Sequence, residues 1–275
     1  MHKTPILVAL CVCMCTKPLF ASFEHSPSDP RGLSMAGAMT ALPGDAFGIF
    51  YNPASPSTAT EIDAGAAYSL PYGDPDLKTL AGGVSWPRLP FDRNSALSAG
   101  VIRHGSDQYR EETVVAGYSR SLTKAIHVGL SVSRFSQEMS GFARDCATGV
   151  NAGLQAEVQP GLVVGVSAFN LNAPSIGASK TALPRSTLAG LSYQLDTGTI
   201  LTVNALTDPD RSARLLAAGE FRVTRRLRMM LGVATNPSII SGGAGFKAGP
   251  IETMAAVSRN PDLGTTASFG VEVKL

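Results

Sequence analysis

The histidines and the paired acidic residues are the side chains of this sequence that could do acid–base chemistry. Two of the four histidines lie within the first 25 residues, ahead of any regular element. His104 stands three residues before Asp107 in a polar loop, and His127 lies in a segment of alternating character. A hydrolytic site needs a nucleophile, a base and an orienting acid or amide held together. No such constellation is visible, so we expect no enzyme and no catalytic residue.

The motifs that suggest metal or nucleotide binding are weak. Asp74 and Asp76, like Asp208 and Asp210, flank prolines and are typical of turns, with too few ligands for calcium. The stretch GAGFKA, residues 243–248, fits a dinucleotide fingerprint. It lies inside an alternating segment with no helix after it, so a phosphate would find no helix N-terminus. We expect no metal and no cofactor.

Composition limits the class of protein. The 275 residues are 44% hydrophobic and 16% charged, which excludes a disordered chain. The formal net charge of +2 gives no reason to expect a nucleic-acid partner, because the basic residues are scattered except around residues 222–228. The 28 glycines, with one Trp and six Tyr, indicate closely approaching backbones and favour β-structure.

The first 21 residues are predicted to be a secretory signal peptide that is removed. Lys3 is followed by an apolar run over residues 6–15, and Ala21 suits cleavage before Ser22. The run is too short to cross a bilayer of about 30 Å as a helix. Lipidation is the alternative, but the three cysteines of the run follow large residues, whereas a lipoprotein signal needs a small one. The mature chain keeps only Cys146, so it has no internal disulfide.

Alternation with period two runs through the rest of the chain. In residues 126–133, Ile, Val, Leu and Val share one face, while His, Gly, Ser and Ser share the other. About fourteen such segments follow one another, each of the nine to eleven residues that a tilted strand needs to cross a bilayer. They start near Ile62, Leu77, Ser95, Glu112, Ala125, Ala147, Leu162, Ser186, Thr199, Ser212, Arg226, Ser238, Ile251 and Thr265.

These segments predict an all-β fold, a transmembrane antiparallel β-barrel of about fourteen strands over residues 61–275. Connections on one side are short, as expected for periplasmic turns, and those on the other are longer, up to residues 170–185. The exception is a long periplasmic connection, residues 87–94. A soluble β-sandwich or a β-solenoid also alternates. The small Gly, Ala and Ser side chains of the polar face favour a crowded lumen, although 7% aromatic residues provide little for two interfacial girdles.

Residues 22–60 precede the first strand and are predicted to form a leader and a lumenal hatch. A lumen of about fourteen strands is too wide for side chains alone to fill, so a segment must plug it or it conducts water. We expect a short helix over residues 33–41, a turn at Asn52-Pro53, and gating by the apolar cluster of Phe47, Ile49, Phe50 and Tyr51. The alternative is an amphipathic stretch that caps the barrel base.

The stretch PRGLSMAGAMTALPGDAFGIFYNPAS, residues 30–55, resembles the amino-terminal signature of the PorV/PorQ family and of the wider FadL-like outer-membrane transporters. GEFRVTRRLRMMLGVATNP, SGGAGFKAG and NPDLGTTASFGVEV resemble closing strands of that family. The resemblance implies a fourteen-stranded barrel with an amino-terminal hatch. On this chain the hatch motif falls on Met35, Gly37, Ala38, Asp45, Ala46, Phe50, Asn52, Pro53 and Ala54.

Charged residues on the lumenal face of the last strands form a second candidate set. Arg222 and Arg228 are expected to pair with Glu220 and with acids on nearby strands, across the tight turn VTRRL. A turn that meets lipid headgroups or peptidoglycan is the alternative. The full set is Glu220, Arg222, Arg228, Lys247, Glu272 and Lys274.

Together these observations predict a protein of the outer membrane of a diderm bacterium, in contact with outer-membrane lipid, that passes or binds a hydrophobic small molecule. The FadL-like transporters of fatty acids are longer, with large outer loops that only residues 170–185 could match. The alternative is a protein-interaction barrel of a secretion system, which the resemblance associates with type IX secretion. It would dock secreted proteins on its loops with no transport through the lumen.

Overall fold

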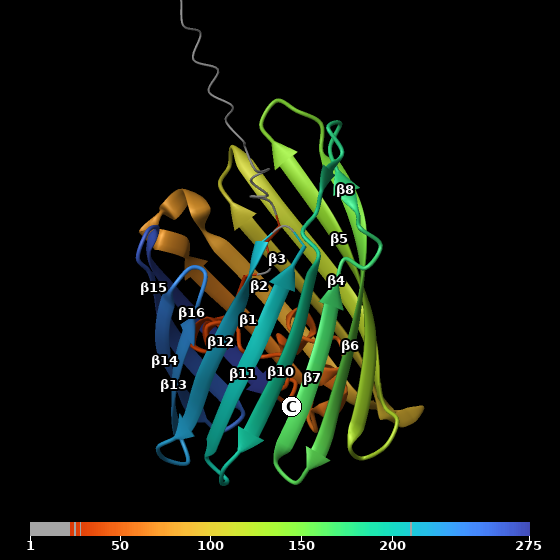
Figure 1. Cartoon of the computed structure of the whole chain (residues 1–275), viewed down its shortest axis with the longest axis vertical. Coiled ribbons are helices and arrows are strands. Elements are labelled where there is room, and N and C mark those ends of the chain that lie inside the picture. Colours follow the sequence, from red (N-terminus) through yellow and green to blue (C-terminus); the bar gives the residue numbers. More distant parts are fainter. Residues whose placement is uncertain (1–22, 25, 28, 210) are drawn as a thin grey trace, which may run out of the picture.

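A computed structural model describes residues 23–24, 26–27, 29–209 and 211–275, and the predicted signal peptide lies outside them. Fourteen antiparallel strands close into one barrel, in which β1 pairs with both β2 and β16 (Figure 1). Each barrel strand otherwise pairs with the barrel strands that precede and follow it along the chain. The prediction of an antiparallel barrel of about fourteen strands is therefore confirmed.

The strands begin within three residues of the predicted starts. The barrel comprises β1 (Asp63–Leu70), β2 (Thr79–Leu89), β3 (Asp92–Gly105), β4 (Tyr109–Ser121), β5 (Ile126–Met139), β6 (Asp145–Gln159), β7 (Leu162–Phe169), β10 (Ser186–Gln194), β11 (Thr199–Asp208), β12 (Arg211–Arg222), β13 (Leu227–Ala234), β14 (Ile239–Ala248), β15 (Ile251–Asn260) and β16 (Gly264–Lys274). A two-stranded hairpin, β8 (Ser175–Ile176) and β9 (Thr181–Ala182), lies in the connection between β7 and β10.

The two ends of the barrel differ in the length of their connections. The end where β1 begins and β16 finishes carries short turns, and the other carries the β8–β9 hairpin and the β5–β6 loop (Figure 1). By this asymmetry, the short-turn end corresponds to the end predicted to be periplasmic. The expected long periplasmic connection over residues 87–94 is wrong, because β2 extends to Leu89 and β3 begins at Asp92. A register shift between Pro87 and Leu89 hides this extension from the alternation pattern.

The outer face of the barrel is apolar and exposed. β15 alternates exposed and buried residues along its whole length, and its exposed set includes Ile251 and Val257. Exposed aromatic residues gather near the periplasmic ends of five strands: Trp86, Tyr118, Tyr193, Phe221 and Phe246. An apolar band bordered by aromatic side chains is the surface of a barrel that spans a membrane. Tyr68, Tyr72 and Phe142 are exposed toward the other end, so aromatic side chains occur at both ends of the barrel.

The segment of residues 29–59, here called the lumenal segment, lies inside the barrel (Figure 1). It contains the helix α1 (Pro30–Ser34) and the 3₁₀ turns η1 (Gly48–Phe50) and η2 (Ser55–Thr58). Two further 3₁₀ turns, η3 (Pro71–Gly73) and η4 (Pro75–Leu77), lie between β1 and β2. No helix in the described part of the chain is long and apolar enough to cross a membrane.

The helix predicted over residues 33–41 is wrong in position and length. Asp29 caps the N-terminus of α1 by accepting a hydrogen bond from the Gly32 amide, and Pro30 occupies the first turn. Ala36 and Gly37 then take positive φ angles of 50° and 81°, which end the helix. The helix therefore comprises only five residues.

The lumenal wall is built to let the backbone of this segment approach closely. A Cβ placed on Gly65 would lie 2.7 Å from Phe47 Cε2, and one on Gly83 would collide with the Ala46 carbonyl. Ten wall glycines on ten strands face the lumenal segment in this way: Gly65, Gly83, Gly100, Gly117, Gly129, Gly153, Gly165, Gly232, Gly243 and Gly270. Glycine leaves room there for main chain, as at Gly83 and Gly129, and for side chains, as at Gly65 and Gly100.

The substitution Gly83→Ala tests whether this fit seats the lumenal segment. The added methyl meets backbone atoms of Ala46, so we expect the barrel to form while the segment loses about 1–3 kcal/mol of binding to the wall. Liposome swelling with a small sugar should then become faster than for the wild type. Gly82→Ala is the matched control, because its Cβ would meet its nearest atoms at 3.7 Å. Equal swelling for the two variants would contradict the role of the glycine wall.

Candidate functional site

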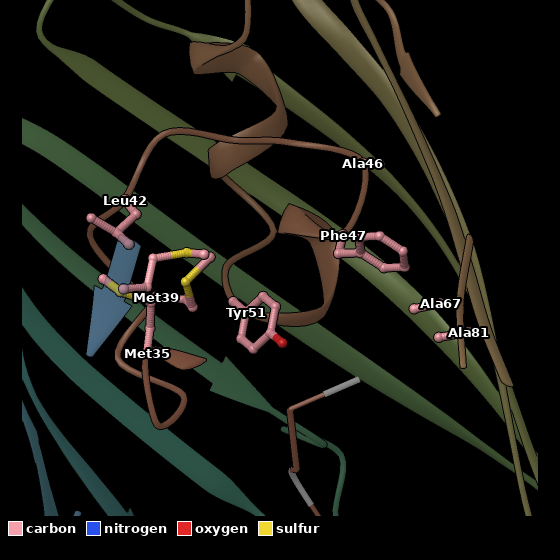
Figure 2. Close-up of a cluster of buried hydrophobic side chains, with 9 residues drawn as sticks. Met35, Met39, Leu42, Ala46, Phe47, Tyr51, Ala67 and Ala81 are labelled. Carbon is pink, nitrogen blue, oxygen red and sulfur yellow. The ribbon is translucent and has the colours of Figure 1, made fainter. Parts of the chain in front are cut away.

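An apolar cluster joins the lumenal segment to the wall. Met35, Met39, Leu42, Ala46, Phe47 and Tyr51 of the segment are buried with Ala67 of β1, Ala81 of β2 and Met230 of β13. Figure 2 shows Phe47 directed toward Ala67 and Ala81, and the two methionines gathered with Leu42. The segment is thus packed as a core, against strands on different sides of the barrel.

The predicted gating residues are directed at different parts of the surroundings. Phe50 lies against Gly100, where a Cβ would be 2.7 Å from its Cε2, and Ile49 Cδ1 lies 3.0 Å from the Cβ position of Gly117. Tyr51 turns the other way and donates from its hydroxyl to Asp29 Oδ1 at 2.5 Å. The predicted cluster is therefore divided. Phe50 and Ile49 contact the wall, whereas the Tyr51 hydroxyl is bonded within the segment.

Arg31 carries a buried positive charge and lies at the start of a chain of ion pairs. Its Nη1 is 2.7 Å from Asp45 Oδ2, and its Nε is 3.0 Å from Glu220 Oε2 on β12. The other oxygen of Glu220 is 3.2 Å from Arg228 Nη1, and Arg228 Nε is 2.6 Å from Glu252 Oε1. The chain of ion pairs links the lumenal segment to β12, β13 and β15. These side chains are little exposed, so their charges are weakly screened and removing one partner would leave a buried charge unpaired.

Asp29 is a buried carboxylate with its hydrogen bonds made within the lumenal segment. Burial, together with the nearby charge of Asp45, raises the pKa of Asp29 to about 6, against the lowering effect of hydrogen bonds from Tyr51 and Gly32. The guanidinium of Arg31 remains charged, because the adjacent carboxylates raise its pKa well above the ordinary value in spite of burial. Asp29 and Arg31 lie outside the predicted hatch motif, although an Asp-Pro-Arg-Gly stretch is a recognisable helix N-terminus.

Wall side chains satisfy the carbonyl groups of the lumenal segment. Gln155 Nε2 donates to the carbonyls of Thr40 and Leu42, each at 2.9 Å. Ser192 donates to Ala41 at 2.8 Å, and Ser241 donates to Ser34 at 3.0 Å. These bonds matter because a buried carbonyl without a partner is costly. The polar face of the strands thus serves as a set of donors for irregular backbone.

Asn52 connects the lumenal segment to itself and to the wall. Its Nδ2 donates to the Thr40 carbonyl at 2.8 Å and to the Leu154 carbonyl of β6 at 3.1 Å, and its Oδ1 accepts from the Ala54 amide at 3.0 Å. The bond to Ala54 forms the predicted turn at Asn52-Pro53. A side chain of this length and polarity is therefore required, which gives a physical reason for the Asn-Pro-Ala motif.

The remaining predicted charged residues are spread along the lumenal face. Lys274 Nζ is 3.6 Å from Asp63 Oδ2. Glu272 is only 1% exposed and neither carboxylate oxygen has a hydrogen-bond partner among the described residues. Lys247 is exposed near the periplasmic end of β14. The sequence predicts a pair between Arg222 and Glu220, which the structure does not have. Arg222 Nη1 instead donates to the Thr197 carbonyl at 3.1 Å, at the end of the strand.

A small apolar pocket lies beside the lumenal segment in the outer half of the lumen. Ala36, Gly37 and Tyr51 form one side, and the other is formed by Leu188, Leu206 and Leu216 of strands β10 to β12, with Pro27 and Arg214 at its edge. Its volume of about 20 Å³ holds a water molecule and no more. A hydrocarbon could enter only if the lumenal segment moved.

The histidines have ordinary hydrogen-bond partners. His104 Nδ1 lies 2.8 Å from Thr79 Oγ1, and His127 Nδ1 lies 2.8 Å from Ser121 Oγ and 3.2 Å from Ser57 Oγ. In the described residues, no group of three or more His, Cys, Asp and Glu side chains could hold a metal ion.

Known proteins resemble this chain in structure. No protein-family model and no curated protein matches the sequence. Among solved structures, the Ralstonia pickettii toluene transporter TbuX superposes with a TM-score of 0.68 at 11% identity, over 92% of this chain and 100% of that one. A Pseudomonas aeruginosa FadL homologue gives 0.65 at 13% identity, over 90% and 98% of the two chains. The monoaromatic hydrocarbon channel CymD gives 0.64 at 12% identity, over 90% and 97%. The chain therefore shares the fold of these barrels.

The substitution Glu220→Gln tests the chain of ion pairs. It leaves Arg31 and Arg228 with fewer buried partners, and breaking a buried pair costs about 3–5 kcal/mol. We expect trypsin to cut after Arg31 in the folded variant in detergent, whereas the wild type is protected at this bond.

The control for this experiment is Arg120→Gln. Arg120 forms an exposed pair with Asp92 at 3.4 Å, and such a pair contributes about 0–1 kcal/mol. Mass spectrometry of the fragments should show no cut after Arg31 in this control. Protection of the bond in Glu220→Gln would mean that the ion pairs do not hold the segment.

Proposed function

We propose that this chain is an outer-membrane channel for small apolar molecules, in which the lumenal segment acts as a hatch. The predicted signal peptide and the apolar outer band support export to the outer membrane of a diderm bacterium. The similar structures named above are described as a toluene transporter, a FadL homologue and a monoaromatic hydrocarbon channel. Small aromatic hydrocarbons are therefore the substrate class that we propose.

The observation that carries this proposal is the apolar pocket against the lumenal segment. Leu188, Leu206 and Leu216 pack with Ala36 and Ala38 of the lumenal segment in a second apolar cluster, and the pocket lies against them. This cluster helps to seat the segment, and its leucines would also contact a hydrocarbon that entered the pocket, which gains about 25 cal/mol for each Å² removed from water. The pocket is closed in this state, so binding and displacement of the segment are coupled.

The proposed opening begins at the contacts that seal the pocket. Tyr51 and Ala36 lie on the lumenal segment and would move away from the leucines when a ligand enters. The segment would turn at Asn52-Pro53, while Met35, Asp45, Phe47, Ile49, Phe50 and Ala54 leave their places on the wall. The ion pairs of Arg31 oppose this movement, so they set how often the hatch opens.

A protein-interaction barrel is the alternative function. Membership of the PorV/PorQ family and a partner in protein secretion rest on sequence resemblance alone, over residues 30–55 and in the closing strands. Such a barrel would keep an inert lumen, and filling the pocket would change nothing that it does. Transport is the function that the pocket favours.

Pairing the substitutions Leu216→Trp and Leu215→Trp tests transport directly. Leu216 lines the pocket and is 2% exposed, whereas Leu215 is 58% exposed on the lipid face of the same strand. We expect uptake of toluene by cells to fall severalfold with the inward Trp and to stay near wild type with the outward one. Gel mobility before and after heating shows that both barrels are folded. Equal uptake by the two folded variants would reject the channel and leave the docking role.

A further inference from the structure

Four arginines gather on the outward face of the barrel at its outer end. Arg103 lies on β3, Arg110 on β4, Arg134 on β5 and Arg144 in the loop after β5. Arg103, Arg110 and Arg134 lie on the same face of their strands as the lipid-facing residues, and Arg144 is exposed in the loop. With Glu112, Ser136 and Glu138, three of them line a polar groove of about 60 Å³.

The patch lies at the upper border of the apolar band. On β4, the outward positions between Arg120 and Glu112 are Tyr118, Ala116 and Val114. Eight residues of a strand tilted by about 40° rise about 20 Å, close to the height of an outer-membrane apolar band of about 25 Å. Glu112 and Arg110 therefore follow directly after the hydrocarbon region, at the level of the outer-leaflet headgroups.

The arginines are only partly neutralised by protein groups. Glu112 accepts from both Arg103 and Arg144, at 2.8 and 2.9 Å. Arg110 is 3.9 Å from Glu138, too far for a close contact. Arg134 has no ion-pair partner among the described residues and is exposed. Two glutamates, Glu112 and Glu138, are therefore near four guanidinium groups. The net positive charge lies at the level where a lipid headgroup would lie.

We infer that this patch is a binding site for a phosphorylated glycolipid of the outer leaflet, with lipid A phosphate as the bound group. Guanidinium groups recognise phosphate with paired hydrogen bonds and charge. The long contact of Arg110, and the lack of an ion-pair partner for Arg134 among the described residues, leave donors for that purpose. The acyl chains of the lipid would lie on an apolar strip in which Val101 is one outward position below Arg103, Val132 is one below Arg134, and Val114 pairs with Arg134 across β4 and β5. The inference rests on the proposed outer-membrane location and is independent of what passes through the lumen.

Native mass spectrometry of the full chain in detergent tests this site with defined lipids. The probes are bisphosphorylated lipid A, fully dephosphorylated lipid A and inorganic phosphate. At about 0.15 M salt we expect the wild type to retain bisphosphorylated lipid A, and R110Q/R134Q to bind it at least tenfold more weakly. R259Q is the control, because Arg259 is an exposed arginine near the outer end of β15, away from the patch. Its binding should equal the wild type.

The three probes distinguish lipid A phosphate from free phosphate, and the heating control distinguishes loss of the site from unfolding of the variant. Equal retention by R110Q/R134Q and the wild type, or equal binding of dephosphorylated lipid A, would overturn the site. Full displacement of the lipid by millimolar inorganic phosphate would show a site for free anions only, which also overturns it. If heating shows that the double variant is unfolded, R144Q in the loop carries the same expectation. The toluene uptake described above is measured separately, so failure of transport leaves this result intact.

Discussion

A lumen of fourteen strands is too wide for side chains to fill, and this constraint shapes the rest of the structure. The space is filled by irregular main chain, which brings polar groups into a dry interior where each needs a partner. The wall meets that need with donors such as Gln155, Ser192 and Ser241. It also provides room through glycines such as Gly83, where any side chain would collide with the segment. The small and polar lumenal face is therefore complementary in shape and hydrogen bonding to the lumenal segment.

The same constraint explains the buried charges. Hydrogen bonds and two apolar clusters hold the segment along its length, whereas the ion pairs from Asp45 through Arg31 and Glu220 to Arg228 hold it at one place. A buried charge is tolerated only while its partners remain in position. The segment is thus bound by contacts that are strong when complete and costly when partly broken, which suits a plug with a closed and a displaced state. The apolar pocket is lined by the same segment, so a ligand that binds there would favour the displaced state over the closed one.

The sequence predicted the barrel well because alternation is a local signal that every strand repeats. Strand starts fell within three residues, and the one wrong connection, at residues 87–94, occurred where a register shift interrupts the alternation. The helix over residues 33–41 was predicted from apolar spacing, whereas the cap at Asp29 and the positive φ of Ala36 moved and shortened it. The pairing of Arg31 with Glu220 and the partners of Gln155 could not be predicted, because they join residues more than 100 positions apart through the lumen. Only the richness in glycine indicated the close approach of backbones.

In the proposed function, the lumenal segment closes a pore that the barrel would otherwise form. A comparison of the full chain with a chain that lacks residues 31–57 tests this closure, first by gel mobility before and after heating and then by liposome swelling with small solutes. We expect both chains to shift on heating and only the shortened chain to admit the solutes. A shortened chain that shifts on heating and still excludes small solutes would contradict this expectation, because the barrel would then be closed without its plug.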